Sequence, residues 1–143
     1  MAIRQITVEL ENVPGKLAKL SGMLGAEGVN IRAISVADAS AEAALIRIIA
    51  DDPSKAVKVL RGHRYICRER EVIAVETPDH PGGLSAVVKP LAEAAINVQY
   101  LYGYLGRVGG NCILILSVDK TDEAVEMLKR NWVHVLGDEL YNL

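Results

Sequence analysis

The chain has 143 residues, half of them hydrophobic, and its formal net charge at pH 7 is −2. This composition supports a sizeable core, and no apolar run is long enough to span a membrane. The basic residues between Arg61 and Arg70 alternate with Glu69 and Glu71, as in a solvated segment. The sequence therefore argues against nucleic acid and membranes as partners.

Two cysteines, Cys67 and Cys112, stand alone in apolar contexts. Neither has a Cys or His neighbour at metal-ligand spacing, so we expect no metal site and no cofactor. Reduced core thiols are the main interpretation, and a disulfide is the alternative. The N-terminus has a strand-like pattern and not the layout of a signal peptide, which favours a cytoplasmic protein.

The first half predicts the order strand, helix, strand, strand, helix, strand. Apolar and polar residues alternate from Ile6 to Leu10, and Leu17, Leu20 and Leu24 then recur at helical spacing. Strand patterns follow over 29–36 and 43–50. A capping acid and a proline at 51–53 predict the start of the second helix, and 65–67 reads as the fourth strand.

The second half predicts the same order, with strands over 72–76, 97–105, 111–118 and 133–136 and helices over 84–94 and 121–129. Pro90 removes a helical hydrogen bond, so we expect a bend or restart between residues 86 and 90. Thr121 is expected to cap its helix, Trp132 to anchor the core, and Leu140 to pack under a final turn. Residues 67–72 contain no Gly, Pro or Ser, so one strand is expected to run almost directly into the next.

The two halves are copies of one another. Pro14 and Pro81 lie 67 residues apart, and each precedes an asparagine, Asn30 or Asn97, by 16 residues. The same offset pairs Ile6 with Ile73, Val8 with Val75, Glu9 with Glu76, Leu24 with Leu91, Ile46 with Ile113, Ile48 with Ile115 and Asp52 with Asp119. A repeat that persists through strands, loops and helices indicates a duplicated domain. We expect domains at 1–69 and 70–143.

The element order predicts an α+β fold of two tandem ferredoxin-like βαββαβ modules. Right-handed crossovers place both helices of a module on one face of a four-stranded antiparallel sheet. Tyr100, Tyr102 and Tyr104 alternate along one strand and so share one side, which favours an interface or core lining over a ligand cage. His63 and His134 lack matched partners, and we interpret both as structural.

Both Pro-Gly loops open a helix, and a helix N-terminus suits a small anionic or zwitterionic ligand. The adjacent glycines permit close approach, and the amides of Asn30 and Asn97 can bind both a carboxylate and an ammonium group. Plainer interpretations remain open at this point. Asn12 and Asp79 can be helix caps, the Pro-Gly pairs can serve the turn alone, His80 can be simply solvated, and Asn30 and Asn97 can satisfy backbone groups.

These loops and asparagines resemble the ACT domain family, whose pattern is Asp/Asn-x-Pro-Gly-x-Leu, a helix, then Gly-hydrophobic-Asn-Ile. Residues 12–17 and 28–31 match in the first copy, and 79–84 and 95–98 in the second, where Ala95 replaces the glycine. The resemblance covers nearly the whole chain and implies modules joined side by side into a larger sheet. It implies that a free amino acid binds where modules or subunits meet. The implied binding residues are Asn12, Val13, Pro14, Gly15, Asn30, Ile31, Asp79, His80, Pro81, Gly82, Gly83, Leu84, Asn97 and Val98.

The resemblance further implies a regulatory, non-catalytic protein that acts through its assembly state or through an enzyme of amino-acid metabolism in trans. The sequence offers no catalytic triad, metal-ligand cluster or nucleotide-binding loop that would indicate an enzyme. A homodimer is expected because the edge strands of such modules need covering. Two alternatives remain: an interaction subunit that has lost its ligand site, and a small enzyme on a ferredoxin-like scaffold.

Overall fold

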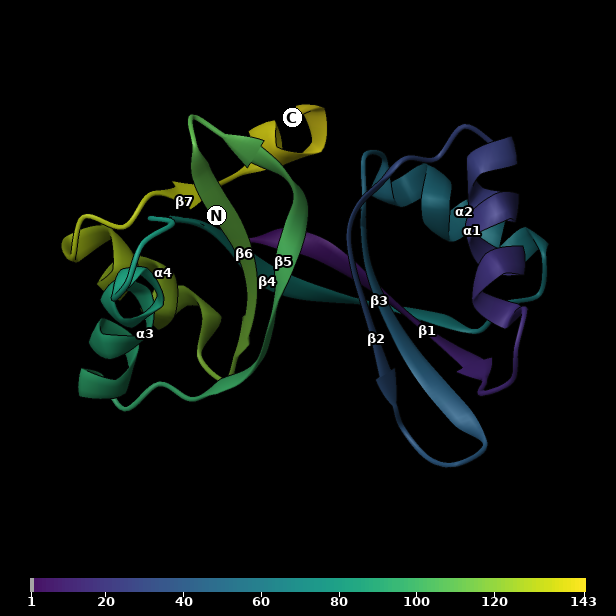
Figure 1. Cartoon of the computed structure of the whole chain (residues 1–143), viewed down its shortest axis with the longest axis horizontal. Coiled ribbons are helices and arrows are strands. Elements are labelled where there is room, and N and C mark those ends of the chain that lie inside the picture. The colour runs from purple at the N-terminus through teal and green to yellow at the C-terminus, as the bar shows by residue number, and fades with distance from the viewer. Residues whose placement is uncertain (1) are drawn as a thin grey trace. The chain divides into compact units, whose positions relative to one another are not determined.

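The computed structural model describes residues 2–143, apart from the side chains of residues 107 and 108. The chain divides into two compact units, Arg4–Arg70 and Glu71–Leu143, and Ile3 is grouped with the second (Figure 1). No helix in the described part of the chain is long and apolar enough to cross a membrane. We refer to the two units as the first and second modules.

The first module contains β1 (Ile3–Glu11), α1 (Lys16–Ala26), β2 (Ile31–Asp38), β3 (Ala43–Ala50), α2 (Pro53–Gly62) and the start of β4 (Cys67–Thr77). β3 pairs antiparallel with both β1 and β2, and β1 also pairs with β4. The strand order β4-β1-β3-β2 is that of the ferredoxin-like fold. Both helices cover the same face of this sheet (Figure 1).

The core of the first module lies between its helices and its sheet. Leu20 and Leu24 of α1 and Leu60 of α2 pack with Ile6 and Val8 of β1 in one buried cluster. The predicted start of α2 is confirmed: Asp52 caps the helix by accepting the N–H of Lys55 at 3.1 Å, and Pro53 occupies the first helical position. Local signals and apolar periodicity therefore agree over this module.

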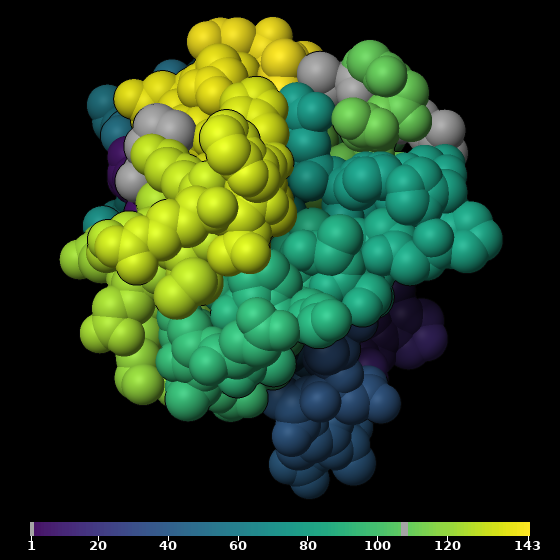
Figure 2. Space-filling model, turned by 90° about the vertical axis from the view of Figure 1, so that its left-hand side faces the viewer, coloured from purple at the N-terminus to yellow at the C-terminus, as the bar shows by residue number. Residues whose placement is uncertain are grey.

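The second module contains the rest of β4, α3 (Gly83–Glu93), β5 (Val98–Val108), β6 (Asn111–Val118), α4 (Thr121–Arg130), β7 (Val135–Leu136) and a 3₁₀ turn (Asp138–Asn142). β6 pairs with β4 and β5, and β4 pairs with β7, all antiparallel, which repeats the strand order of the first module. The space-filling view shows α3 and α4 lying side by side (Figure 2). Leu140 is fully buried under the final turn, as predicted.

The α+β fold of two tandem modules is confirmed, but the described residues form seven strands in place of eight. The strand predicted at 65–67 is wrong for residues 65 and 66, and a single strand, β4, runs from Cys67 through the strand predicted at 72–76. Its first residues belong to the first module and its later residues to the second. The absence of Gly, Pro and Ser from residues 67–72 had predicted this continuity.

The strand pairing corrects the alignment of the repeat. Val8 lies opposite Ile46 in the first module, whereas Val75 lies opposite Leu114 in the second. The equivalent of Ile46 is therefore Leu114 and not Ile113, and by the same shift Ile48 matches Leu116 and Asp51 matches Asp119. The second copy has one additional residue between Gly103 and Leu114, where the β5–β6 register shifts. A hairpin absorbs such an insertion without disturbing the strands that it joins.

Two further expectations were wrong, and a third was wrong in part. Trp132 does not anchor the core: it is 96% exposed and follows α4 with φ of 62°. Of the bend or restart expected near Pro90, the restart does not occur, because α3 runs unbroken from Gly83 to Glu93 with Pro90 buried. Thr121 is the first residue of α4 and not its cap, and no described side chain caps this helix. Tyr100 and Tyr102 do share one side of β5, with ring centroids 6.4 Å apart.

Candidate functional site

Each predicted corner is a tight turn that leads directly into a helix. The carbonyl before the proline accepts the N–H of the residue after the glycine, over 3.5 Å at Val13 and 3.0 Å at His80. Gly15 and Gly82 have φ of 88° and 85°, in the left-handed region that glycine adopts without strain. Pro followed by Gly with these angles defines a type II turn. The Pro-Gly pairs are thus explained by the turn alone, whether or not a ligand is present.

The interpretation of Asn12 as a helix cap is wrong. The N-cap residues of α1 and α3 are Gly15 and Gly82, which have no side chain to cap the helix. Asn12 instead donates from Nδ2 to Asp38 Oδ1 at 3.1 Å, and its backbone N–H donates to the carbonyl of Glu42. The helix dipole is positive at the start of both helices, where backbone N–H groups point out of the first turn.

Asn30 and Asn97 each lie one residue before a strand, and their backbone groups are already satisfied. The N–H of Asn30 donates to Asp51 Oδ1 at 3.0 Å, and the N–H of Asn97 donates to Asp119 Oδ1 at 3.0 Å. Both side chains are exposed, and neither amide has a hydrogen-bond partner among the described residues. The interpretation of these amides as satisfying backbone groups is therefore wrong, because the neighbouring aspartates perform that task.

The asparagine and the corner of one module lie at opposite ends of a helix. α1 begins beside Gly15 and ends four residues before Asn30, and α3 separates Gly82 from Asn97 in the same way. Eleven helical residues span about 16 Å, which is more than one amino acid can bridge. The fold thus does not bring the two halves of the predicted site together within a module.

The remaining predicted residues have different surroundings at the corners and at the starts of the strands. His80 Nδ1 lies 2.8 Å from its neighbouring carbonyl, that of Pro81. Gly83 is buried, and a Cβ there would lie 2.0 Å from the carbonyl oxygen of Pro78. Val13, Leu17 and Leu84 are exposed on the corners, whereas Ile31 and Val98 pack against the two cores.

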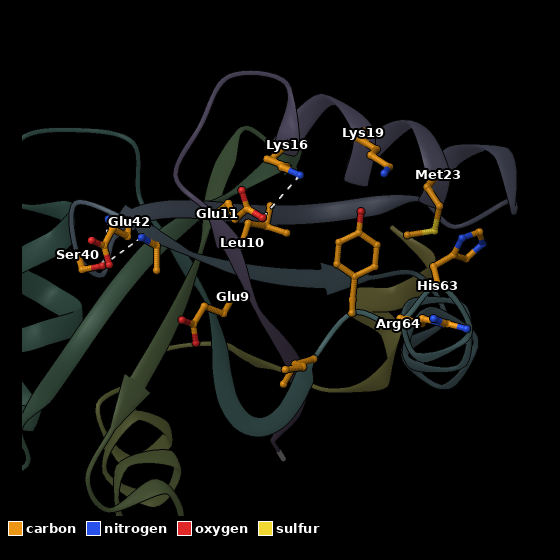
Figure 3. Close-up of a pocket in the computed structure, with 13 residues that line it drawn as sticks. Glu9, Leu10, Glu11, Lys16, Lys19, Met23, Ser40, Glu42, His63 and Arg64 are labelled. Atoms are coloured by element: carbon orange, nitrogen blue, oxygen red, sulfur yellow. Dashed lines mark hydrogen bonds and ion pairs between the residues drawn. The ribbon is translucent and has the colours of Figure 1, made fainter.

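A separate cavity of about 790 Å³ lies on the first module, and we call it the charged trough (Figure 3). Its walls come from the end of β1, the exposed side of α1, the β2–β3 hairpin and the connection from α2 to β4. The lining residues are Glu9, Leu10, Glu11, Lys16, Lys19, Met23, Ser40, Glu42, Ala43, His63, Arg64, Tyr65 and Ile66. None of the predicted site residues is among them.

Sequence reasoning missed the charged trough because its residues come from four separate segments. The signal available was the pair Lys16 and Lys19 on one side of α1, which alone reads as a solvated helix face. In the whole described part of the chain, the charged trough included, no group of three or more His, Cys, Asp and Glu residues could hold a metal ion. Cys67 is buried and Cys112 half-buried, and both are free thiols.

Comparison with known proteins gives a fold and a family. The chain is similar over its full length to the protein BT0572 from Bacteroides thetaiotaomicron, at 27% identity and a TM-score of 0.91, with 98% of that protein covered. It is also similar in fold to the regulatory subunit of aspartate kinase from Thermus thermophilus, at 13% identity and a TM-score of 0.65, with 90% of this chain and 91% of that chain covered. None of the curated proteins compared with the chain matches it.

The family comparison agrees with the motifs and with the fold. The sequence model described as ACT domain pair matches residues 1–143. Two βαββαβ modules with matched Pro-Gly corners and matched asparagines are the features by which the sequence resembled this family. The chain belongs to the ACT domain family, as an ACT domain pair.

Proposed function

We propose that the protein is a regulatory sensor that binds a free amino acid and alters its own assembly or the activity of a partner. The observation that carries this proposal is the pair of exposed asparagine amides, Asn30 and Asn97, which have no partner among the described residues in either copy of the repeat. An amide offers both an acceptor for an ammonium group and donors for a carboxylate. Membership of the ACT domain family supports the same class of ligand.

The separation of corner and asparagine supports a site between copies of the chain. A ligand that contacts a helix start and an asparagine amide must receive them from different modules, because α1 or α3 keeps them apart within one. A homodimer can supply both groups. Exposed apolar side chains at the corners, Val13, Leu17 and Leu84, suit burial against a second copy. The proposal keeps the expectation that modules join side by side into a larger sheet.

The sensor is proposed to be non-catalytic, so its output must pass to another molecule. A ligand shifts an equilibrium between two assembly states only if it binds one state more tightly. A site formed by two copies has this property, because the ligand contacts are complete only in the assembled state. The partner proposed here is an enzyme of amino-acid metabolism that acts in trans.

The test is isothermal titration calorimetry of the full chain with each of the twenty amino acids, combined with light scattering with and without ligand. We expect at least one amino acid to bind, and a dimer at micromolar concentration. If no amino acid binds at millimolar concentration, the sensor function fails and a structural interaction subunit is the better interpretation. A monomer in both conditions removes the site between copies, even if an amino acid binds.

A further inference from the structure

Trp132, the only tryptophan of the chain, contributes nothing to the core of its module. Its side chain is 96% exposed and directly follows the end of α4. Its φ of 62° lies in the left-handed region, where an L-residue is strained and where glycine or asparagine usually stands at a helix end. A large apolar side chain in water on a strained backbone indicates a contact with another molecule.

The equivalent residue of the first module, Arg64, has the same backbone and a different side chain. Its φ is 65°, and its N–H donates to the carbonyl of Arg61 at 3.0 Å, as that of Trp132 donates to the carbonyl of Lys129 at 3.1 Å. The Arg64 guanidinium group has no ion-pair or hydrogen-bond partner among residues 2–143. Because guanidinium groups stack favourably on indole rings, the two copies of the repeat carry complementary groups at one position.

Arg64 belongs to one end of the charged trough, which suits an aromatic ring. Figure 3 shows Lys19, Met23 and Arg64 toward this end and Glu42 toward the other. The Lys19 ammonium group also has no partner in the described part of the chain. The thioether of Met23 is a favourable neighbour for an aromatic ring, and Ile66, which also lines the trough, is 80% exposed. This end therefore offers two cations, a sulfur atom and apolar surface.

The repeat gives the receptor and the tryptophan to different modules. Lys19 is matched by Ala86 and Met23 by Pro90, so the second module does not carry the cationic end of the trough. The first module in turn carries no tryptophan. A contact between two first modules at this position would place one Arg64 against another, and their like charges would repel. The side chains thus favour a contact between the first module of one copy and the second module of another.

We propose that the Trp132 indole of one copy of the chain inserts into the Lys19 and Arg64 end of the charged trough of a second copy. The cavity of about 790 Å³ has room for the indole, whose burial removes roughly 150–250 Å² from water. The negative end of the α4 dipole would then lie beside the two cations. Of the cations in the last turn of α4, Arg130 is paired with Glu126 at 2.6 Å, which leaves Lys129 as the opposing charge. The contact uses neither corner and needs no amino-acid ligand.

The test is the fluorescence of the full chain over a dilution series, because its emission comes from Trp132 as the single tryptophan. We expect emission at a shorter wavelength in the assembled protein and a shift to that of a solvated indole on dilution, at the midpoint found by light scattering. Lys19→Ala and Arg64→Ala should each raise this midpoint about tenfold, as expected for a cation–π contact shielded from water. Lys58→Ala and Arg61→Ala are matched controls on α2, outside the charged trough, and should leave it unchanged.

A mixing experiment tests which groups meet. Trp132→Ala keeps the charged trough and lacks the indole, whereas the double variant Lys19→Ala and Arg64→Ala keeps the indole and lacks both cations. The double variant alone should emit as a solvated indole. Adding Trp132→Ala should shift this emission to shorter wavelength, because one variant then supplies the receptor and the other the tryptophan. Such a rescue also shows that both variants are folded.

The outcomes separate this contact from the proposed function. Assembly without any change in emission overturns the contact, as does a chain that stays monomeric at every concentration. A midpoint that the trough variants leave unchanged, or a mixture without rescue, shows that Trp132 docks elsewhere and also overturns it. The calorimetric test of amino-acid binding is independent of Trp132, so the sensor function can fail while the contact holds, and the reverse.

Discussion

Asn30 and Asp51 are joined by two hydrogen bonds that run in opposite directions. The N–H of Asn30 donates to Asp51 Oδ1 over 3.0 Å, and the N–H of Asp51 donates to the carbonyl of Asn30 over 2.9 Å. The same carboxylate oxygen accepts the N–H of Asp52 at 3.0 Å. The Asp51 carboxylate thus connects the start of β2 to the start of α2 by hydrogen bonds. Asn97 and Asp119 repeat the arrangement at 3.0 and 3.2 Å.

We predict that Asp51→Ala lowers the free energy of unfolding by about 1–2 kcal/mol, because two backbone N–H groups lose their acceptor. Asp119→Ala should have a smaller effect, since its carboxylate accepts the N–H of Asn97 and no second backbone N–H among the described residues. Urea denaturation followed by circular dichroism measures both. Asp51→Asn is the control, because its amide oxygen retains an acceptor. If Asp51→Ala lowers the free energy of unfolding by less than about 0.5 kcal/mol, the hydrogen bonds of the Asp51 carboxylate do not stabilise the fold.

The amides of Asn30 and Asn97 are predicted to act on binding and not on folding. Asn97→Ala should weaken amino-acid binding by about 1–3 kcal/mol, because a polar group of the bound ligand loses its partner. Stability should change by less than about 0.5 kcal/mol, since the exposed amides make no hydrogen bond to any other described residue. Calorimetry of Asn30→Ala and Asn97→Ala in parallel decides which copy binds. Asn142→Ala is a surface control, and unchanged affinity in Asn97→Ala removes that residue from the site.

Gly83 is predicted to be the least replaceable glycine of the two corners. A Cβ at Gly83 would lie 2.0 Å from the Pro78 carbonyl oxygen, so backbone must move. Gly83→Ala should cost about 3 kcal/mol, at the upper end of the usual range for overpacking. The equivalent Lys16→Ala should be nearly neutral, because a side chain already occupies that position. Thermal melts compare the two, and equal melting temperatures would contradict the predicted clash.

Most of the fold could be predicted because its signals are local and occur twice. The alternation in β1, the leucine spacing in α1 and the Asp52-Pro53 helix start each determine structure within a few residues. The same pattern in the second copy then confirmed the module. Even the joining of two strands into β4 followed from the composition of residues 67–72.

The failures arose where distant residues decide the outcome. After the β5–β6 hairpin, the sequence alone cannot decide between Ile113 and Leu114 as the equivalent of Ile46, because both are apolar. Only the strand pairing shows that Leu114 is the equivalent residue. The sequence predicts Trp132 as a core anchor after the last helix, whereas in the structure its position after α4 turns it to solvent. The charged trough depends on four segments that only the fold assembles. The sequence alone also does not show the separation of Asn30 from its corner, because that separation is the length of α1.

Ala95 provides the last prediction, at the turn that ends α3. It replaces the family's glycine, yet its φ is 56°, beside 77° for the equivalent Gly28. Both turns close in the same way, since the N–H of Ile96 donates to the carbonyl of Leu91 at 2.9 Å and the matching bond of the first module has the same length. A left-handed angle costs an L-residue about 1 kcal/mol that glycine avoids.

Ala95→Gly should therefore raise the free energy of unfolding, by somewhat less than about 1 kcal/mol because glycine also gains entropy in the unfolded chain. Gly28→Ala is the matched reverse substitution and should lower it by a similar amount, with the mobile end of Lys55 as the nearest contact at 3.2 Å. Urea denaturation of both variants beside the wild type gives the two signs. If Ala95→Gly destabilises the protein, its methyl group contributes packing that outweighs the backbone strain, and the turn is not a site of stored strain.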